Sequence, residues 1–237
     1  MCSSDLTVYH VPYWVAAPIC ILLVAGLGAL LHFLVIEPLL SAAPINQLLA
    51  TGGVLFVLQS FATVAFGIDF RNLGIRLPIL AMGEMHFSYS RLLAFIAAGV
   101  GMIAVYLFMT RTYTGTAIRA IAQDRQIMAL MGVDTRRMYL VTSALGGGLA
   151  GLAACLLVLQ YDVHPFVGLS FGPITFLICV LGGLGNFVGG FVAAFLFAEI
   201  ISLGGLFSDL EWGYVLAFAF FIAMMFVRPA GLLARRS

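Results

Sequence analysis

The chain has 237 residues, of which 63% are hydrophobic and only 9% are charged, and its formal net charge is +1. Soluble domains are roughly 45–50% apolar, so this composition is typical of a membrane protein. All basic residues are arginines, which excludes a Walker A motif because that motif needs a lysine to reach the phosphates. The near-neutral charge also argues against nucleic-acid binding, which requires a basic face.

Apolar runs recur along the chain, separated by shorter polar segments. Each run carries few or no charges and none alternates with a period of two, so helices fit better than the strands of a barrel. We expect an all-α, polytopic membrane protein with about seven spanning or half-spanning helices, built as a single transmembrane domain over residues 1–237. The runs cover residues 14–36, 48–67, 92–110, 138–160, 173–203 and 213–227.

The placement of arginine predicts which segments face the cytosol. The loop 111–137 is rich in arginine, and so is the C-terminal tail, so the positive-inside rule places both in the cytosol. Two segments on one side require an even number of crossings between them. The 173–203 run must therefore be a re-entrant hairpin or two short helices that turn near the cytosolic face. The arginines are Arg111, Arg119, Arg125, Arg136, Arg137, Arg228, Arg235 and Arg236.

Glycines mark two further features. Gly147 and Gly151 lie on one face of the 138–160 run, where small residues let helices approach closely in lipid. A second glycine-rich stretch breaks the 173–203 run, and broken helices at membrane depth are tolerated mainly where they are buried in protein or line a cavity. The break is therefore a candidate part of a translocation path, with close packing as the alternative. Its residues are Gly182, Gly183, Gly185 and Asn186.

Glu199 is an ionisable residue inside an apolar run. Such residues are costly in lipid and are functional candidates by default. We expect its side chain to face protein or water rather than lipid. It is either a polar lining of the translocation path or a packing residue that hydrogen-bonds to a neighbouring helix.

The arginine-rich loop contains a predicted helix. Thr116 can cap its start, residues 117–131 are mostly good helix formers, and Gly132 suits a left-handed position after the helix. Asp134 or Thr135 can then cap the next helix. We expect the helix to bind a soluble partner, with the alternative that it rests on lipid headgroups. The residues expected to make the contact are Arg119, Asp124, Arg125, Met128 and Gly132.

Patterns typical of enzymes and metal sites are weak in this chain. Residues 168–172 match G-x-S-x-G, but they lie between apolar runs rather than in a strand–turn–helix context. The histidines are too dispersed for a metal site. We therefore expect no enzymatic activity, no metal and no cofactor.

Four segments, taken in order, resemble the permease subunits of branched-chain amino acid ABC importers. They are RAIAQDRQIMALMGVD, TSALGGGLAGLAACLL, LGGLGNFVGG and VRPAGLLARR. The resemblance is closer to the LivH-like subunit than to the LivM-like subunit, chiefly through residues 122–125, and it extends from about residue 14 to the end. Members of this family usually begin with further spanning segments, so we expect the chain to lack N-terminal spanning segments.

The resemblance implies a pore-forming subunit of an ATP-driven importer for branched-chain or related amino acids, in the bacterial inner membrane. The implied partners are a homologous permease subunit, two cytosolic ABC ATPase subunits and an extracytoplasmic substrate-binding protein. The loop helix would receive the motion of the ATPase. An ion-coupled secondary transporter and a membrane scaffold without transport activity remain the alternatives.

Overall fold

The computed structural model of the protein describes residues 13–40, 42–70, 79–82, 85–183, 186–207, 210–228 and 231. The chain divides into two compact units, Met1–Pro165 (unit 1) and Phe166–Ser237 (unit 2), and each is described by itself. Gly185, Arg235 and Arg236 lie outside the described residues, and only the backbone of Arg125 is described.

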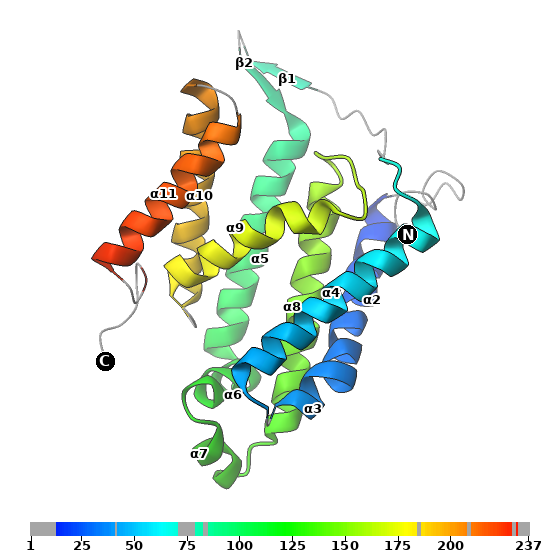
Figure 1. Cartoon of the computed structure of the whole chain (residues 1–237), viewed down its shortest axis with the longest axis vertical. Coiled ribbons are helices and arrows are strands. Elements are labelled where there is room, and N and C mark those ends of the chain that lie inside the picture. The colour runs from blue at the N-terminus through cyan, green and yellow to red at the C-terminus, as the bar shows by residue number, and fades with distance from the viewer. Residues whose placement is uncertain are drawn as a thin grey trace. The chain divides into compact units, whose positions relative to one another are not determined.

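Unit 1 consists of helices and one small hairpin (Figure 1). The first helix is continuous but changes its winding, from α through a five-residue π turn and back to α. The hairpin is antiparallel and pairs Ile79 with Ser88. The elements are α2 (Tyr13–Leu31), η1 (His32–Ile36), α3 (Glu37–Leu39), α4 (Pro44–Phe66), β1 (Ile79–Met82), β2 (Met85–Ser88), α5 (Tyr89–Arg111), α6 (Tyr113–Gln123), α7 (Arg125–Leu130) and α8 (Thr135–Leu157).

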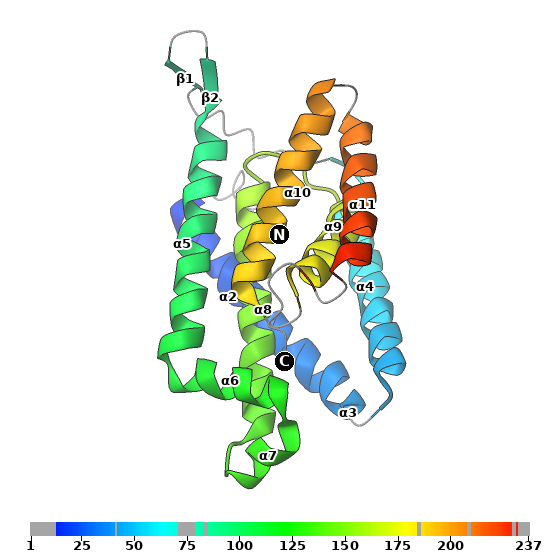
Figure 2. The same cartoon turned by 90° about the vertical axis from the view of Figure 1, so that its left-hand side faces the viewer.

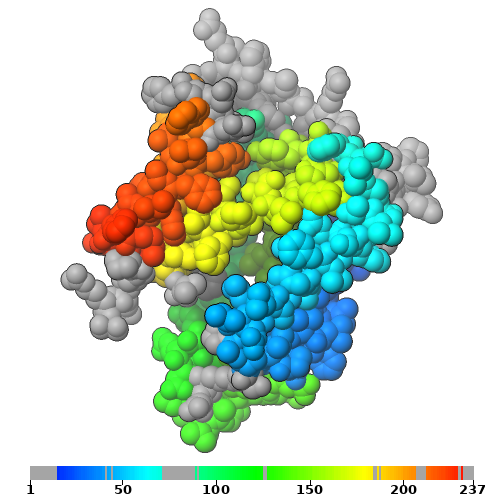
Figure 3. All heavy atoms as spheres, viewed as in Figure 1, coloured from blue at the N-terminus to red at the C-terminus, as the bar shows by residue number. Residues whose placement is uncertain are grey.

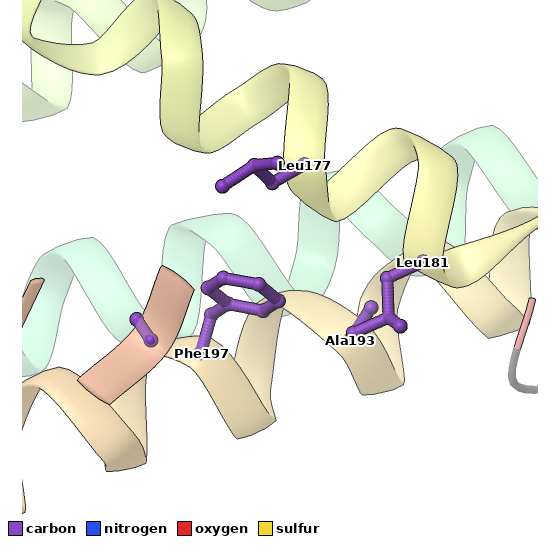
Figure 4. Packing of buried hydrophobic residues seen from close by; sticks show 5 residues of the cluster. Leu177, Leu181, Ala193 and Phe197 are labelled. Carbon is purple, nitrogen blue, oxygen red and sulfur yellow. The ribbon is translucent and has the colours of Figure 1, made fainter. Parts of the chain in front are cut away.

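Unit 2 consists of α9 (Val167–Gly182), α10 (Phe187–Phe207) and α11 (Leu210–Val227). Its core lies where these helices meet, and Figure 4 shows Leu177 and Leu181 of α9 facing Ala193 and Phe197 of α10. Ala217 of α11 completes the buried cluster. The unit thus has a small apolar core of its own.

Among the described residues, five helical segments are long and apolar enough to cross a membrane, and two shorter apolar helices accompany them. Large apolar side chains are exposed along these segments, as expected for surfaces that face lipid rather than water. No side chain described in α4 is buried, and this helix lies on the surface in Figure 3. The predicted all-α, polytopic membrane fold is confirmed. The long segments are Val15–Leu39, Ile45–Phe66, Arg91–Arg111, Thr135–Leu157 and Val188–Leu206.

The apolar run 173–203 forms two helices rather than one. α9 ends at Gly182 and α10 begins at Phe187, so the chain breaks within the predicted glycine-rich stretch. The first helix begins earlier than the run suggests, and Pro173 lies inside it. Membrane helices tolerate such an internal proline because neighbouring groups can satisfy the freed backbone carbonyl.

The ends of each unit can be compared with the topology that arginine predicts. Figure 2 shows α6 and α7 at the end of α5 opposite the β1–β2 hairpin. Glu37 lies at this same end of unit 1, because it forms an ion pair with Arg136 at the start of α8. We call this the loop end. In unit 2, Gly231 packs on Gly183, so the α9–α10 break and the C-terminal end of α11 lie together. Within unit 1 the helices α4 and α5 separate Glu37 from the loop, and within unit 2 the helices α10 and α11 separate the break from the end of α11.

Candidate functional site

A close turn joins α5 to α6 at the loop end. A Cβ atom on Gly115 would lie 2.5 Å from the Cα of Met109, so only glycine lets α6 fold back against α5 here. The Thr112 hydroxyl accepts a hydrogen bond from the Gly115 N–H at 3.1 Å and caps α6. The prediction that Thr116 caps this helix is wrong. Thr116 lies within the first turn of α6, where its hydroxyl donates to the carbonyl of Thr112.

One face of α6 anchors it to the rest of unit 1. Ala117 and Ile121, one turn apart, are 4% and 5% exposed, and Met109 of α5 is buried as well. Arg119 lies on the exposed face. Because a short helix is stabilised mainly by packing of its apolar face, these contacts hold α6 firmly against α5 and α8.

The helix predicted over 117–131 is not continuous. Asp124 has an extended backbone (φ −149°, ψ 106°), and it separates α6 from α7. Its side chain accepts a hydrogen bond from the Ile127 N–H at 3.0 Å and so caps the start of α7. Aspartate breaks the helix because its carboxylate offers the backbone donors an alternative to the helical carbonyls.

The helix α7 presents apolar side chains to the surroundings. Ile127, Leu130 and Met131 are 56%, 88% and 74% exposed, whereas Met128 is half-buried. These three exposed residues are called the α7 patch below. In a soluble environment, clustered apolar side chains of this kind mark an interaction site.

Gly132 ends α7 in the left-handed conformation that the sequence predicts, with φ of +81°. The Val133 N–H donates to the Met128 carbonyl at 3.2 Å, and the Gly132 N–H donates to the Ala129 carbonyl at 3.2 Å. These two bonds form a Schellman motif. Asp134 then caps α8 by accepting a hydrogen bond from the Arg137 N–H at 3.2 Å, so of the two predicted caps Asp134 is the correct one.

The long helix α8 packs closely along α2. A Cβ atom on Gly147 would lie 2.6 Å from the carbonyl oxygen of Val24 and 3.2 Å from the Cα of Gly28. A Cβ atom on Gly151 would lie 3.1 Å from the Cα of Ile21. The small residues singled out in the sequence thus lie where the two backbones approach each other.

Polar residues join α2 and α8 nearer the loop end. His32 is fully buried, its Nδ1 lies 3.1 Å from Ser143 Oγ, and its ring stacks on Tyr139. Glu37 forms the ion pair with Arg136, whose guanidinium also lies 5.8 Å from the centre of the Phe33 ring. Sequence reasoning does not select His32 or Glu37. The sequence does contain a signal for both, because each is an ionisable side chain within or at the edge of an apolar run.

In unit 2 the α9–α10 break is held by backbone contacts. Gly183 has φ of +89°, and a Cβ atom on Gly182 would lie 2.5 Å from the Cα of Gly190. The Asn186 side chain accepts a hydrogen bond from the Gly189 N–H at 3.0 Å and caps α10. The start of α10 therefore approaches the end of α9 so closely that Gly182 admits no side chain.

Glu199 is exposed and lies outside the apolar core of unit 2. It follows Asn186 by more than three helical turns, which corresponds to about 20 Å along α10. The structure thus does not bring Glu199 together with the break. Residues 168–172 lie in the helix α9, so their G-x-S-x-G pattern has no nucleophile-elbow geometry. The described part of the chain contains no cluster of potential metal ligands.

Comparison with known proteins identifies the family of this chain. Residues 2–225 match the model of a family described as branched-chain amino acid transport system / permease component. The chain belongs to this family. It is 32% identical to the high-affinity branched-chain amino acid transport system permease protein BraD of Pseudomonas aeruginosa over 157 residues, which is 65% of this chain and 51% of BraD.

Two relatives named LivH align over more of the chain. The LivH permease protein of Salmonella typhimurium is 26% identical over 226 residues, covering 91% of this chain and 72% of LivH. That of Escherichia coli is 27% identical over 210 residues, covering 84% and 67%. No solved structure matches. These relatives are named as permease components of transport systems, not as enzymes.

Proposed function

We propose that this chain is the pore-forming permease subunit of an ATP-driven importer for branched-chain or related amino acids in the bacterial inner membrane. It would act with a homologous permease subunit, two cytosolic ATPase subunits and an extracytoplasmic binding protein. The chain has no lysine for a Walker A motif, so another subunit must hydrolyse ATP. Family membership supports a transport role, and the loop end supports the coupling to a partner.

The observation that carries the coupling proposal is the contrast between α6 and α7. α6 is anchored by Ala117 and Ile121, whereas α7 exposes the α7 patch. A force on α7 would therefore reach α5 and α8 through a firmly packed helix rather than through a loose loop. We propose that the ATPase binds the α7 patch with Met128 at its edge. Arg119, Asp124 and Arg125 would supply the polar contacts, and Gly132 would set the angle between α7 and α8.

We propose that the α9–α10 break forms part of the translocation path near its cytosolic end. Gly182, Gly183, Gly185 and Asn186 would supply backbone polar groups to the path there, as broken helices do in other transporters. Glu199 would contribute a polar side chain further along α10.

The test is co-purification and uptake with the complete complex reconstituted in proteoliposomes. Leu130→Asp places a charge at the centre of the α7 patch and should reduce the bound ATPase by about tenfold, as for the loss of an interface hot spot. The matched control is Ile68→Asp. Ile68 is 66% exposed and follows the C-terminal end of α4, which is the end of that helix away from the loop end. Equal binding by both variants would contradict the proposed contact.

Wild-type uptake distinguishes the remaining functions. Accumulation that requires ATP supports the importer. Accumulation driven by an ion gradient without ATP would indicate a secondary transporter, and no uptake with a complete complex would indicate a scaffold. If Leu130→Asp retains the bound ATPase, the α7 patch does not bind the ATPase, and contact with lipid headgroups becomes the explanation for its exposed apolar side chains.

A further inference from the structure

The short helix α3, which follows α2 and η1 without a break, is linked to the loop end by an ion pair. α2 lies more than 70 residues before the loop in sequence, yet Glu37 reaches Arg136, the second residue of α8. Only Val133 and Asp134 separate the left-handed turn at Gly132 from the start of α8. Glu37 therefore contacts α8 four residues after Gly132, at the loop end of unit 1.

The π turn decides which residue makes this contact. Gly28 of α2 faces Gly147, and His32 of η1, four residues later, faces Ser143. In a regular helix the next residue on this face would be Ile36, because four residues complete about one turn. In the π turn the Glu37 N–H bonds to the His32 carbonyl instead, so one extra residue is accommodated and Glu37 takes the position facing α8.

Local stability does not account for this arrangement. The Arg136 side chain is 64% exposed and that of Glu37 is 22% exposed, so water screens the cation and limits what the pair adds to stability. The second carboxylate oxygen of Glu37 is buried and has no hydrogen-bond partner among the described residues. The same is true of His32 Nε2. π turns are rare and are frequent at functional sites. An ion pair that contributes little to stability, placed by an unusual turn, is better explained by what it connects.

We propose that Glu37 is a positioning residue that makes α2 move with α8 when the loop end is displaced. The Gly28–Gly147 contact holds the middle of the two helices together, and the Glu37–Arg136 pair would hold their ends beside the loop. Motion at α7 would then reach α2 as well as α8. This inference rests on the proposed coupling function, because it concerns how that motion is distributed.

The test measures amino acid uptake per ATP hydrolysed in the reconstituted complex. Glu37→Gln keeps the size of the side chain and removes its charge, and it should lower this ratio about two- to fivefold, which is the range expected for one ion pair whose cation is exposed. Arg136→Gln should have the same effect. The double variant Glu37→Arg with Arg136→Glu restores an ion pair in reverse and should recover most of the ratio.

The matched control is Arg137→Gln. Arg137 is adjacent and 82% exposed, and it pairs with Asp134 at the start of its own helix, so its loss should leave the ratio unchanged. A general structural defect would lower complex yield and ATPase activity together and would not be rescued by the charge reversal.

The outcomes separate this inference from the proposed function. No ATP-driven uptake by the wild type would overturn the proposed function, and with it the inference. ATP-driven uptake by the wild type with an unchanged ratio in Glu37→Gln would overturn the inference alone. A charge-reversed variant that assembles but keeps the low ratio would also overturn it.

Discussion

Gly132 shows how one residue can set the direction of a whole segment. It ends α7 with a positive φ, and apart from its two chain neighbours no residue has an atom within 4 Å of the position where a Cβ would be. Any effect of a substitution there must come from backbone strain rather than from a clash. A left-handed backbone costs a β-branched side chain more than it costs asparagine, which visits this conformation more readily.

We expect Gly132→Val to destabilise the turn by about 1–2 kcal/mol and to lower ATP-driven uptake several-fold while the protein stays in the membrane. Uptake assays with the reconstituted complex, together with quantification of the membrane fraction, measure this. Gly132→Asn is the matched control and should retain most of the uptake. Equal uptake by the valine variant and the wild type would show that the turn does not guide coupling.

At the scale of the element, the contact between α2 and α8 depends on side chains being absent. The two backbones approach most closely around Gly28 and Gly147, and in lipid such close approach replaces the hydrophobic effect as the source of helix association. A Cβ atom on the adjacent Gly146 would meet no neighbouring atom within 4 Å. Neighbouring glycines on one helix therefore have opposite roles.

Gly147→Leu and Gly151→Leu should each destabilise unit 1 by about 1–3 kcal/mol, the usual effect of overpacking. Thermal denaturation in detergent and the yield of assembled complex measure this effect. Gly146→Leu changes the same residue type on the same helix and should leave both values close to those of the wild type. A similar loss for all three variants would point to a general intolerance of leucine in α8 rather than to helix packing.

At the scale of the whole molecule, the remaining question is which side of the membrane each end faces. In unit 2 the break before α10 lies with the end of α11, where Arg228 is exposed. The far end of α10 carries Leu206, which is 79% exposed. The arginine distribution predicts that the first of these ends faces the cytosol.

Labelling of single cysteines tests this topology. With the native cysteines replaced, a membrane-impermeant maleimide should label Asn186→Cys and Arg228→Cys in inside-out vesicles but not in intact cells. Leu206→Cys should show the reverse pattern. Arg228→Cys is included because Asn186→Cys also removes the cap of α10. Labelling of residue 186 only from outside would contradict the predicted orientation.

Features that depend on a few neighbouring residues could be predicted from the sequence. They include the apolar helices, the break near Gly182, the left-handed turn at Gly132 and a cap at Asp134 or Thr135, of which the structure uses Asp134. The reason is that each rests on interactions within one or two helical turns. Even here a competing local interaction changed the result, because the Asp124 carboxylate divided the expected helix into α6 and α7.

Other features were decided only by the tertiary structure. Thr112 rather than Thr116 caps α6, because Gly115 lets the chain turn tightly against α5. His32 meets Ser143, which is 111 residues away in sequence, and Glu37 meets Arg136 through a π turn. The apolar pattern of a membrane helix shows that it is buried in lipid or protein but not which neighbour it faces. That choice is made by packing between helices, and it is packing that positions the polar residues at the loop end.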